Sequence, residues 1–337
     1  MNRKKFYLIF FVIIALIVFS ISAKQQREYS THIEGVMDTT ADITVITKND
    51  GTKIIGEISE LINRYDKMLS HTDRESEIYK LNCSKEEKVS DETYEIINKC
   101  GELFDDTCHA YDITVGTISE LWNDAFKTGI LPDHHTIEKK LESVGYDNLR
   151  LGDNVVKFDK DLKINLGSVA KGYTTDKIKE YLEQEKVKDA LINFGGNIYA
   201  KGKNRNGELW NIGVQDPLNN DELLLSLKIS DKFVITSGNY IRYADINQKR
   251  YHHIIDANTG YPVDNELNSV TIISDSGFCG DALSTSCFLI GFEASKTLLE
   301  RYDVLAVFAT KDNKIFYSRE LENSMQKISE NYEYIPF

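Results

Sequence analysis

The pattern of apolar and polar positions divides the chain into a helix-rich first half and a strand-rich second half. Alternation over residues 35–46 predicts a strand, and an Asn-Asp-Gly turn signal follows at residues 49–51. Apolar residues then recur three and four positions apart over residues 58–69, which predicts an amphipathic helix. Further helices are expected over residues 76–82, which begin with a serine N-cap, and over residues 93–104.

The second half consists mainly of short apolar runs separated by turn residues. Such runs predict strands, here over residues 189–199, 209–214, 223–229, 233–236, 250–255 and 269–273. Helices are expected at 280–291 and 294–302, followed by a hairpin of 304–309 with 314–318. Strands and helices mix without strict strand–helix alternation. The fold class is therefore expected to be α+β, with mixed, largely antiparallel sheets and flanking helices.

One stretch, residues 164–196, combines a short apolar strand, a turn at Gly167, a helix opening near Ser168 and a second strand ending in Gly195-Gly196. The free N–H groups and positive dipole end of a helix start suit an anion such as phosphate. Lys171 adds a full positive charge in the first turn. The alternative is an ordinary strand–helix–strand unit whose glycines only make tight turns, and this stretch alone leaves both interpretations open.

The first 24 residues are interpreted as a targeting segment. Residues 2–5 are basic at three positions, and residues 6–19 are continuously apolar. This arrangement is typical of a signal peptide or an uncleaved N-terminal membrane helix, with the basic end in the cytoplasm. Residues 25–34 are then expected to form a linker and residues 35–337 the functional domain. The body is expected to be extracytoplasmic, either anchored in the cell membrane or secreted.

Composition narrows the function classes. The chain has 337 residues, enough for a large core, and a net charge of −13. A nucleic-acid partner is not expected, because phosphate backbones require clustered Lys and Arg. The cysteines number five and include no Cys-x-x-Cys pair, which argues against a zinc ribbon or a thioredoxin-like site. They are expected to be buried thiols, with one disulfide left open.

Two segments contain side chains suited to chemistry. Asp281 and Thr285 are four residues apart on a predicted helix, so a carboxylate and a hydroxyl share one face, as Mg²⁺ ligands often do. The alternative is a helix cap beside a packed threonine. His252 and His253 lie on a predicted strand and face opposite sides, one toward a cleft as a general base and the other toward solvent. The alternative is a structural histidine.

Two other segments are weaker. Residues 236–240 form a small-residue turn that a ligand can approach closely, or simply a strand end. The neighbouring His134-His135 pair invites a metal-site interpretation. It is not favoured, because adjacent residues point in different directions on a helix or a strand.

Eight segments in this order resemble one family, the FAD:protein FMN transferases, or ApbE-like flavin transferases. The resemblance extends from about Met37 to Phe308. The segments that carry it are Met37-Asp-Thr-Thr-Ala, Ser76-Glu-Ile-Tyr-Lys-Leu-Asn, Tyr111-Asp-Ile-Thr-Val-Gly, Leu166-Gly-Ser-Val-Ala-Lys-Gly-Tyr, Asn193-Phe-Gly-Gly-Asn, Thr236-Ser-Gly-Asn-Tyr, His252-His-Ile-Ile-Asp-Ala-Asn-Thr-Gly-Tyr-Pro and Asp281-Ala-Leu-Ser-Thr.

The resemblance implies an ApbE/T-fold-like enzyme that uses Mg²⁺ and FAD as substrate. It would attach FMN through its phosphate to a Thr or Ser hydroxyl of an acceptor protein and release AMP. It implies His253 as the functional histidine, Mg²⁺ ligands from Asp281, Thr285 and the Ala170 carbonyl, and ring stacking by Tyr79. The implied FAD contacts are Met37, Tyr79, Ala110, Tyr111, Asp112, Gly167, Tyr173 and Ile255.

The sequence departs from the family pattern at three positions. Asp38 and Ser168 stand where Gly is common, and Ala257 where Pro is frequent. Two alternatives stay open: a Mg²⁺-dependent FAD pyrophosphatase that uses water to yield FMN and AMP, and a non-catalytic extracytoplasmic FAD-binding protein. The chain lacks the acceptor pattern Asp-x-x-Ser/Thr-Gly-Ala-Thr that the resemblance suggests, so self-modification is not expected.

Overall fold

The structure is a computed structural model that describes residues 26–219 and 221–337. The predicted targeting segment, residues 1–24, therefore lies outside the described residues. Within the described part, no helix has the length and apolar character needed to cross a lipid bilayer.

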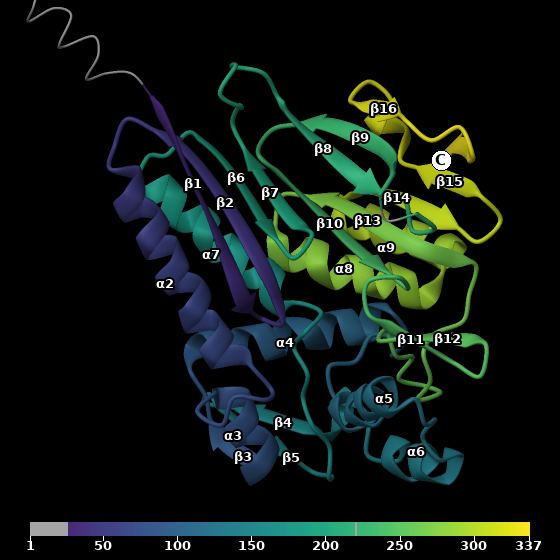
Figure 1. The fold of residues 1–337 in the computed structure, drawn as a ribbon. Helices are drawn as coiled ribbons and strands as arrows, with labels where there is room; N and C mark the ends of the chain where they lie inside the picture. Colours follow the sequence, from purple (N-terminus) through teal and green to yellow (C-terminus); the bar gives the residue numbers. More distant parts are fainter. Residues whose placement is uncertain (1–25, 220) are drawn as a thin grey trace, which may run out of the picture.

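A nine-stranded sheet forms the centre of the molecule (Figure 1). Neighbouring strands are antiparallel except for the parallel pair of β15 and β17 at one edge. All eight residues of β13 are buried, which marks it as a central strand covered on both faces. The expected α+β class with largely antiparallel strands is confirmed. In spatial order the strands are β1 (Arg27–Val36), β2 (Thr39–Thr47), β6 (Asp189–Phe194), β7 (Asn197–Lys201), β10 (Lys232–Gly238), β13 (Leu267–Ser274), β14 (Leu305–Thr310), β15 (Lys314–Tyr317) and β17 (Glu333–Pro336).

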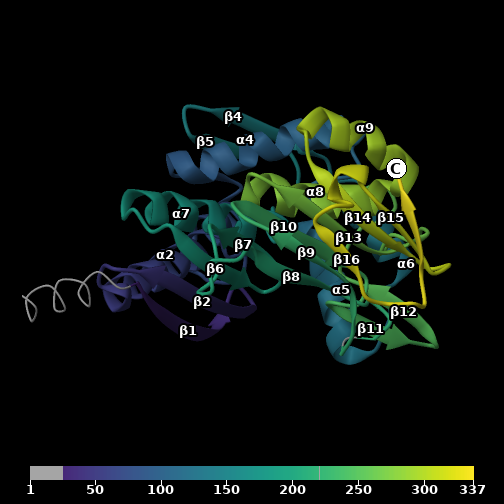
Figure 2. The ribbon, with the colours of Figure 1, turned by 90° about the horizontal axis from the view of Figure 1, so that it is seen from above.

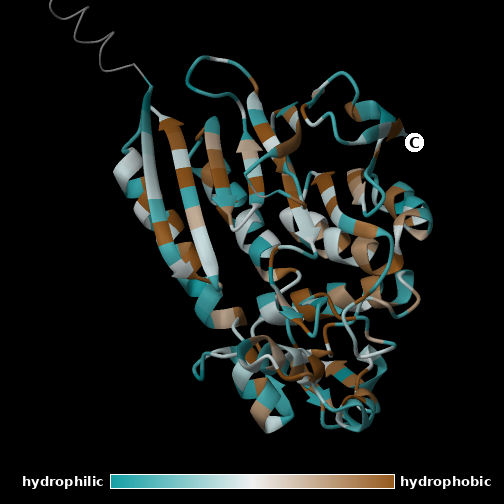
Figure 3. Cartoon of the chain, turned by 45° about the vertical axis from the view of Figure 1, so that its right-hand side comes forward, coloured by the Kyte–Doolittle hydropathy of each residue, from teal (hydrophilic) through white to brown (hydrophobic). Residues whose placement is uncertain are grey.

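Helices cover one face of this sheet, and a small sheet covers the other (Figure 2). The helices on the covered face are α2 (Gly51–Leu69), α7 (Ala170–Gln184), α8 (Gly277–Ile290) and α9 (Phe292–Tyr302). The opposing sheet consists of β8 (Trp210–Gln215), β9 (Leu223–Ile229) and β16 (Met325–Lys327). Hydrophobic residues gather between these layers, and many of the peripheral loops are hydrophilic (Figure 3).

The remaining elements form a lower layer next to the helices. Strands β11 (Tyr243–Ile246) and β12 (Lys249–His252) form a two-stranded sheet. This sheet packs on α5 and α6, and the apolar residues between them form a separate cluster. The other elements of this layer are α3 (Glu77–Ser84), α4 (Asp91–Asp106), α5 (Gly116–Thr128), α6 (His134–Leu141), β3 (Glu86–Lys88), β4 (Leu149–Gly152), β5 (Val155–Phe158) and the short 3₁₀ helix Tyr146–Asn148; a second 3₁₀ helix, Arg319–Leu321, follows β15.

Most predicted helices are present and begin at side chains that cap them. Ser76 accepts a hydrogen bond from the Tyr79 amide, as expected for the N-cap of α3. The predicted turn at residues 49–51 is instead the start of α2, because the Asp50 carboxylate accepts from the amides of Thr52 and Lys53. The same residue types occur in turns and at helix N-caps, so the Asn-Asp-Gly sequence alone does not distinguish between the two.

Three sequence-based expectations need correction. Residues 27–34, expected as linker, belong to β1, which pairs with β2 along nearly its whole length. The predicted strand before Gly167 is absent, since Lys163 forms only an isolated bridge, and α7 begins at Ala170 rather than near Ser168. Of the cysteines, Cys100 and Cys287 are buried as expected, but two others are exposed: Cys83 and Cys108.

Helices α7 and α8 touch through their backbones, and this contact positions the candidate site. A Cβ on Gly172 would lie 2.1 Å from the carbonyl oxygen of Gly277. Asp176 of α7 fixes the same junction, because its carboxylate accepts from the amides of Gly277 and Phe278 at the start of α8. In the sequence, Gly172 stands out only as one member of a motif. Its role is to let two helix backbones approach closely.

Gly172→Ala is expected to lower the free energy of unfolding by about 3 kcal/mol, the upper end for an overpacked interior. The added methyl group meets backbone, which cannot rotate away. Gly56→Ala is the matched control, because Gly56 also lies within a helix but a Cβ added there would meet nothing within 4 Å. That variant should gain about 0.5–1 kcal/mol from helix propensity. Urea unfolding of both variants measures the difference, and equal effects would contradict the close contact.

Candidate active site

A cavity of about 640 Å³ opens where the ends of the main sheet meet α5, α7 and α8. Its volume is typical of a small-molecule site. Its wall joins segments that are far apart in the sequence: the β1–β2 turn, the α2–α3 loop, the start of α7, and the segment after β12. Nine of the predicted site residues line it, namely Met37, Tyr111, Asp112, Gly167, Ala170, His253, Ile255, Asp281 and Thr285.

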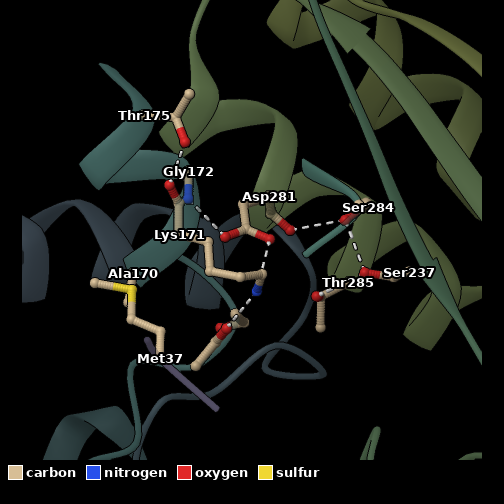
Figure 4. A network of polar contacts seen from close by, with 12 residues as sticks. Met37, Ala170, Lys171, Gly172, Thr175, Ser237, Asp281, Ser284 and Thr285 are labelled. Carbon is tan, nitrogen blue, oxygen red and sulfur yellow. Dashed lines mark hydrogen bonds and ion pairs between the residues drawn. The ribbon is translucent and has the colours of Figure 1, made fainter. Parts of the chain in front are cut away.

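Asp281 is the central carboxylate of the cavity and is only 3% exposed. Its Oδ2 accepts a hydrogen bond from the Gly172 amide at 2.9 Å, and its Oδ1 lies 3.7 Å from the Lys171 ammonium (Figure 4). Burial raises the pKa of Asp281 above its ordinary value, and the charge of Lys171 acts against that shift. The protein therefore confines a carboxylate at this position and stabilises its charge with a neighbouring cation.

Thr285 follows Asp281 by one turn of α8, as the sequence spacing predicts. Its hydroxyl lies 3.2 Å from the Ser237 hydroxyl, which also contacts Ser284 at 2.8 Å (Figure 4). The small-residue segment at the end of β10 was expected to approach a ligand, and its Thr236 and Ser237 line the cavity. Ser237 also joins the cavity wall to α8, and Thr285 is half-buried at the cavity surface.

The start of α7 offers less backbone to an anion than the sequence suggests. The amide of Gly172 already donates to Asp281, and that of Ala170 donates to the Leu166 carbonyl. The positive charge at this position comes instead from the Lys171 side chain, whose ammonium also lies 3.3 Å from the Gly167 carbonyl. An anion at this helix start would therefore be held mainly by a side-chain cation.

The same geometry suits a metal cation. A carboxylate, a hydroxyl and a backbone carbonyl are hard oxygen donors of the kind Mg²⁺ prefers. Ala170 lines the cavity, and its carbonyl accepts a hydrogen bond from the Thr174 hydroxyl at 2.7 Å. Lys171 shows that a positive charge is accommodated beside Asp281. Among the described residues there is no cluster of three or more His, Cys, Asp or Glu side chains, so a metal here would depend on these mixed oxygen donors.

His253 faces the cavity from the segment that follows β12. Its backbone amide and its Nδ1 both lie 3.1 Å from the Arg242 carbonyl oxygen. A carbonyl only accepts hydrogen bonds, so Nδ1 carries the proton and Nε2 is left as a free base. Burial lowers the pKa of His253 to about 4, and the charges of Arg242 and Lys171 contribute. The imidazole is therefore neutral at pH 7.

The neighbouring His252 faces the other way, as the strand alternation predicts. It does not meet solvent, however, because it is buried against the Phe288 ring and its Nε2 lies 2.9 Å from the Val263 carbonyl. Burial lowers its pKa to about 4 as well. His252 is thus a structural histidine, and His253 is the one available to a ligand.

Tyr111 and Asp112 line the cavity but are engaged in holding their loop. The Tyr111 hydroxyl lies 2.9 Å from that of Ser168 and so joins this loop to the turn before α7. The Asp112 carboxylate accepts from the amides of Thr114 and Tyr146. Burial is the main influence on Asp112 and raises its pKa, while these two hydrogen bonds oppose the shift.

Three predicted ligand contacts do not line the cavity. Tyr79 lies on α3, whose apolar face turns its neighbours Ile78 and Leu81 into the core. Tyr173 is part of the core, with its ring edge-on to that of Tyr65 at 5.6 Å. Ala110 does not line the cavity, although its neighbour Tyr111 does. Contact of these three residues with FAD, including ring stacking by Tyr79, stays a prediction.

The cavity residues that lie outside the predicted site include Asp38, His71, Asn197 and Arg242. No hydrogen bond of the His71 imidazole is found within the described residues, so it is free to meet a ligand, and burial lowers its pKa. The Asn197 amide lies beside Asp281 and helps to lower the pKa of that carboxyl. Asp38 and Asn197 had a sequence signal, since each belongs to one of the eight segments that carry the family resemblance.

Asp38 and Arg242 face each other at the mouth of the cavity. A carboxylate oxygen of Asp38 lies 3.7 Å from a guanidinium nitrogen of Arg242, and both side chains are exposed. Asp38 lies in the β1–β2 turn, where it and Met37 both have positive φ. The ion pair therefore links two distant segments across the opening, although an exposed pair of this kind contributes at most about 1 kcal/mol.

A metal site at the adjacent histidines is not supported. His134 begins α6 and its Nδ1 lies 2.9 Å from the Tyr261 hydroxyl. His135 is exposed and lies 3.8 Å from Glu138. Both therefore have polar neighbours on the surface, away from the cavity wall.

Comparison with known proteins decides the family. The model of the ApbE family matches residues 37–308, which is well over half of the chain. The chain belongs to the ApbE family. The resemblance inferred from the eight sequence segments is thereby confirmed.

Its similarity to ApbE proteins covers nearly the whole of the described body. An FAD:protein FMN transferase of Klebsiella pneumoniae is 32% identical over 292 residues, which cover 84% of this chain and 90% of the relative. One from Treponema pallidum is 29% identical and covers 85% and 86%. The ApbE protein of Thermotoga maritima has a TM-score of 0.81 at 29% identity, with 89% of this chain and 100% of that chain covered. The flavin transferase ApbE of Vibrio cholerae has a TM-score of 0.80 at 25% identity, with 89% and 99% covered.

Proposed function

We propose that this ApbE-family protein transfers FMN from FAD to a Thr or Ser hydroxyl of an acceptor protein and releases AMP, with Mg²⁺ as cofactor. One observation carries the proposal. The neutral imidazole of His253, held in one orientation, shares a cavity with the buried carboxylate of Asp281 and the hydroxyl of Thr285. Relatives named FAD:protein FMN transferases support the reaction type.

The cavity suits a dinucleotide with both flat apolar and anionic parts. One part of its wall is apolar and includes Leu69, Trp122 and Phe126. Another part holds two cations, Lys171 and Arg242, that both act on His253. The flavin ring fits the first environment and the diphosphate the second, which brings the diphosphate beside the base.

Asp281, Thr285 and the carbonyl of Ala170 would hold Mg²⁺. When bound, the metal supplies positive charge that stabilises negative charge developing on the phosphate oxygens. Lys171 would help to neutralise the same charge, because its ammonium lies beside Asp281. The buried setting strengthens these interactions, since fewer water molecules compete for the charged groups.

His253 would act as the general base. Its free Nε2 takes the proton of the acceptor hydroxyl while the hydroxyl oxygen forms a bond to the phosphorus of the FMN moiety. The phosphoanhydride bond to AMP breaks in the same displacement, and AMP leaves with the electron pair of that bond. The Arg242 carbonyl holds the protonated Nδ1 throughout, so that Nε2 keeps the correct orientation.

The direct test is incubation of the full chain with FAD, Mg²⁺ and a peptide that carries Asp-x-x-Ser/Thr-Gly-Ala-Thr, followed by mass spectrometry. The expected result is a peptide heavier by one FMN and an equal amount of AMP, both dependent on Mg²⁺. FMN and AMP with an unmodified peptide would favour the pyrophosphatase. Intact FAD would favour the non-catalytic binding protein.

The proposal includes a location outside the cytoplasm, with membrane attachment or secretion directed by residues 1–24. The basic and then apolar pattern of that segment supports it. Fractionation of cells that produce the full chain, followed by protease treatment of intact cells stripped of any outer envelope, tests the location. Protection of the protein from the protease would contradict it.

Asp38→Asn is expected to lower the KM for FAD by about twofold to fivefold, the range of an exposed ion pair. Without the carboxylate, Arg242 is released from its ion pair and is free to bind the diphosphate. Asp275→Asn is the matched control, because it removes an exposed ion pair with Lys232 elsewhere on the surface. Steady-state kinetics measures both variants. A raised KM in Asp38→Asn would contradict the competition between Asp38 and the substrate.

A further inference from the structure

A short apolar segment lies exposed at the mouth of the cavity. Ile241 is 53% exposed and Tyr243 is 40% exposed, and they flank Arg242. Ile241 and Arg242 also line the cavity. Isolated exposed apolar side chains are common on protein surfaces. This pair is unusual in its place, because it flanks Arg242, which lines the same cavity as His253.

Tyr243 begins β11, a strand with an open edge. Within the described residues β11 pairs only with β12, in a two-stranded antiparallel sheet. One side of this hairpin is anchored, since Ala244, Ile246 and Tyr251 pack with Trp122 of α5. Figure 1 shows the hairpin at the periphery of the molecule, beside α5. The opposite edge of β11 is therefore available to pair with an added strand.

The start of β11 lies next to the base. Tyr243 pairs with His252, and the next residues along the ladder, Arg242 and His253, are joined by the backbone hydrogen bond of 3.1 Å. The His253 imidazole leans toward β11, because its Nδ1 also bonds to the Arg242 carbonyl. A strand added to the open edge would run about 4.8 Å from β11, on the side away from β12. Where the added segment continues past Tyr243 it reaches Ile241 and Arg242, which line the cavity, so a hydroxyl side chain there would lie at the mouth of the cavity.

The hairpin is cationic on an acidic protein. Residues 239–253 contain three Arg and Lys residues and one Asp, a balance of +2, while the whole chain carries −13. The three cations are exposed, and each lies 3.3–3.7 Å from one carboxylate: Arg242 from Asp38, Lys249 from Asp264, and Arg250 from Asp245. Because such exposed pairs are weak, a carboxylate from a partner can replace them.

We propose that the β11 edge, together with Ile241 and Tyr243, is the docking surface for the acceptor protein. The partner is an extended segment that adds to β11 as a third strand and carries a carboxylate near the hydroxyl to be modified. Small side chains next to that hydroxyl let the segment lie close to Ile241 and Tyr243. This inference rests on the proposed function, because it assumes that the second substrate is a polypeptide.

Tyr243→Ser in the full chain tests the apolar part of the surface. The KM for the acceptor peptide is expected to rise about tenfold, which corresponds to about 1.4 kcal/mol. The Kd for FAD, measured by flavin fluorescence, should stay within about twofold, because Tyr243 does not line the cavity. Leu218→Ser is the matched control, since Leu218 is 64% exposed on a loop between β8 and β9. An unchanged KM in Tyr243→Ser would overturn the proposal.

Charge reversal tests the electrostatic part. Lys249→Glu should raise the KM for the acceptor peptide and weaken its dependence on salt concentration. Lys232→Glu is the control, because Lys232 forms an exposed ion pair with Asp275 away from the hairpin. Equal effects of the two reversals would show a response to net charge only and would overturn the assignment to β11.

Peptides with altered backbones test strand addition without any change in the protein. Two acceptor peptides are N-methylated at alternate positions, so that each lacks one of the two sets of N–H groups. Only one set faces β11 in a paired strand. The proposal expects one peptide to lose FMN transfer and the other to keep it. Equal transfer to both would overturn strand addition.

The two proposals fail in different ways. If the wild-type chain binds or cleaves FAD but modifies no peptide, the proposed function is wrong. The proposed docking surface is then wrong as well, because it assumes a polypeptide acceptor. If the wild-type chain modifies the peptide and Tyr243→Ser does so equally well, only the docking surface is wrong. Thermal unfolding of each variant shows whether a loss of transfer reflects loss of fold.

Discussion

Asp281→Asn is expected to reduce the kcat/KM for FMN transfer by about a hundredfold to a thousandfold, the effect of removing one strong charge-stabilising group. The amide keeps the size and the position of the side chain but removes the negative charge that would hold Mg²⁺. Because burial already raises the pKa of this carboxyl, the neutral amide suits the site, and the protein should remain folded.

The control for this variant is Asp176→Asn. Asp176 is a half-buried carboxylate, and it holds the start of α8 through the amides of Gly277 and Phe278. That variant should mainly lower stability, whereas Asp281→Asn should mainly lower the response to Mg²⁺. Titration of activity with Mg²⁺ and urea unfolding of both variants separate the two effects. An Asp281→Asn enzyme with unchanged Mg²⁺ dependence would contradict the metal assignment.

His253→Gln is expected to slow FMN transfer by about a hundredfold to ten-thousandfold, the range for a general base. FAD binding should persist, because the cations and the apolar wall remain. His134→Gln is the control, since His134 is an exposed histidine whose ring contacts only surface groups. Transfer assays with flavin-binding measurements distinguish the roles. If His253→Gln abolished FAD binding, His253 would be a substrate contact rather than a base.

The same histidine predicts the pH profile. Burial lowers the pKa of His253 to about 4, so the imidazole loses its proton as the pH rises through about 4 and is a free base above it. Transfer should therefore be nearly constant from about pH 6 to pH 8 and fall only as the pH approaches about 4. A wild-type profile with a midpoint near the ordinary histidine value of about 6.5 would contradict this assignment.

How far the sequence predicts this site depends on the kind of element involved. Asp281 and Thr285 can be paired from their spacing because a helix fixes the positions of its faces. The choice of His253 over His252 rests on the family resemblance alone. Strand alternation predicts that the two side chains point to opposite sides, but it does not predict which of them faces the cavity. Ring stacking by Tyr79 stays a prediction of the family resemblance, since Tyr79 lies on α3, which buries Ile78 and Leu81, and it does not line the cavity.

Three of the cavity residues outside the predicted site, Asp38, His71 and Arg242, lie on turns and loops. Asp38 and Arg242 are separated by about two hundred residues and meet only because the sheet brings the β1–β2 turn close to the end of β10. The periodic pattern of apolar residues in the sequence cannot predict a contact between two such distant residues. Gly172 is visible in a motif, but its function is a contact between backbones, which leaves no complementary side chain to recognise. The fold class, by contrast, follows from local patterns repeated along the whole chain.

The group that orients His253 is a main-chain carbonyl, and this has a consequence for mutational scanning. A carboxylate in that role would be lost through a single codon change, whereas every amino acid at position 242 retains the carbonyl. The imidazole tautomer is thus protected against point mutation, and a scan of every residue will not reveal the partner. Only an altered polypeptide backbone exposes it, for example an ester introduced by chemical synthesis, because an ester carbonyl is a weaker acceptor. The backbone of the hairpin, rather than another side chain, therefore keeps Nε2 of His253 in its reactive orientation.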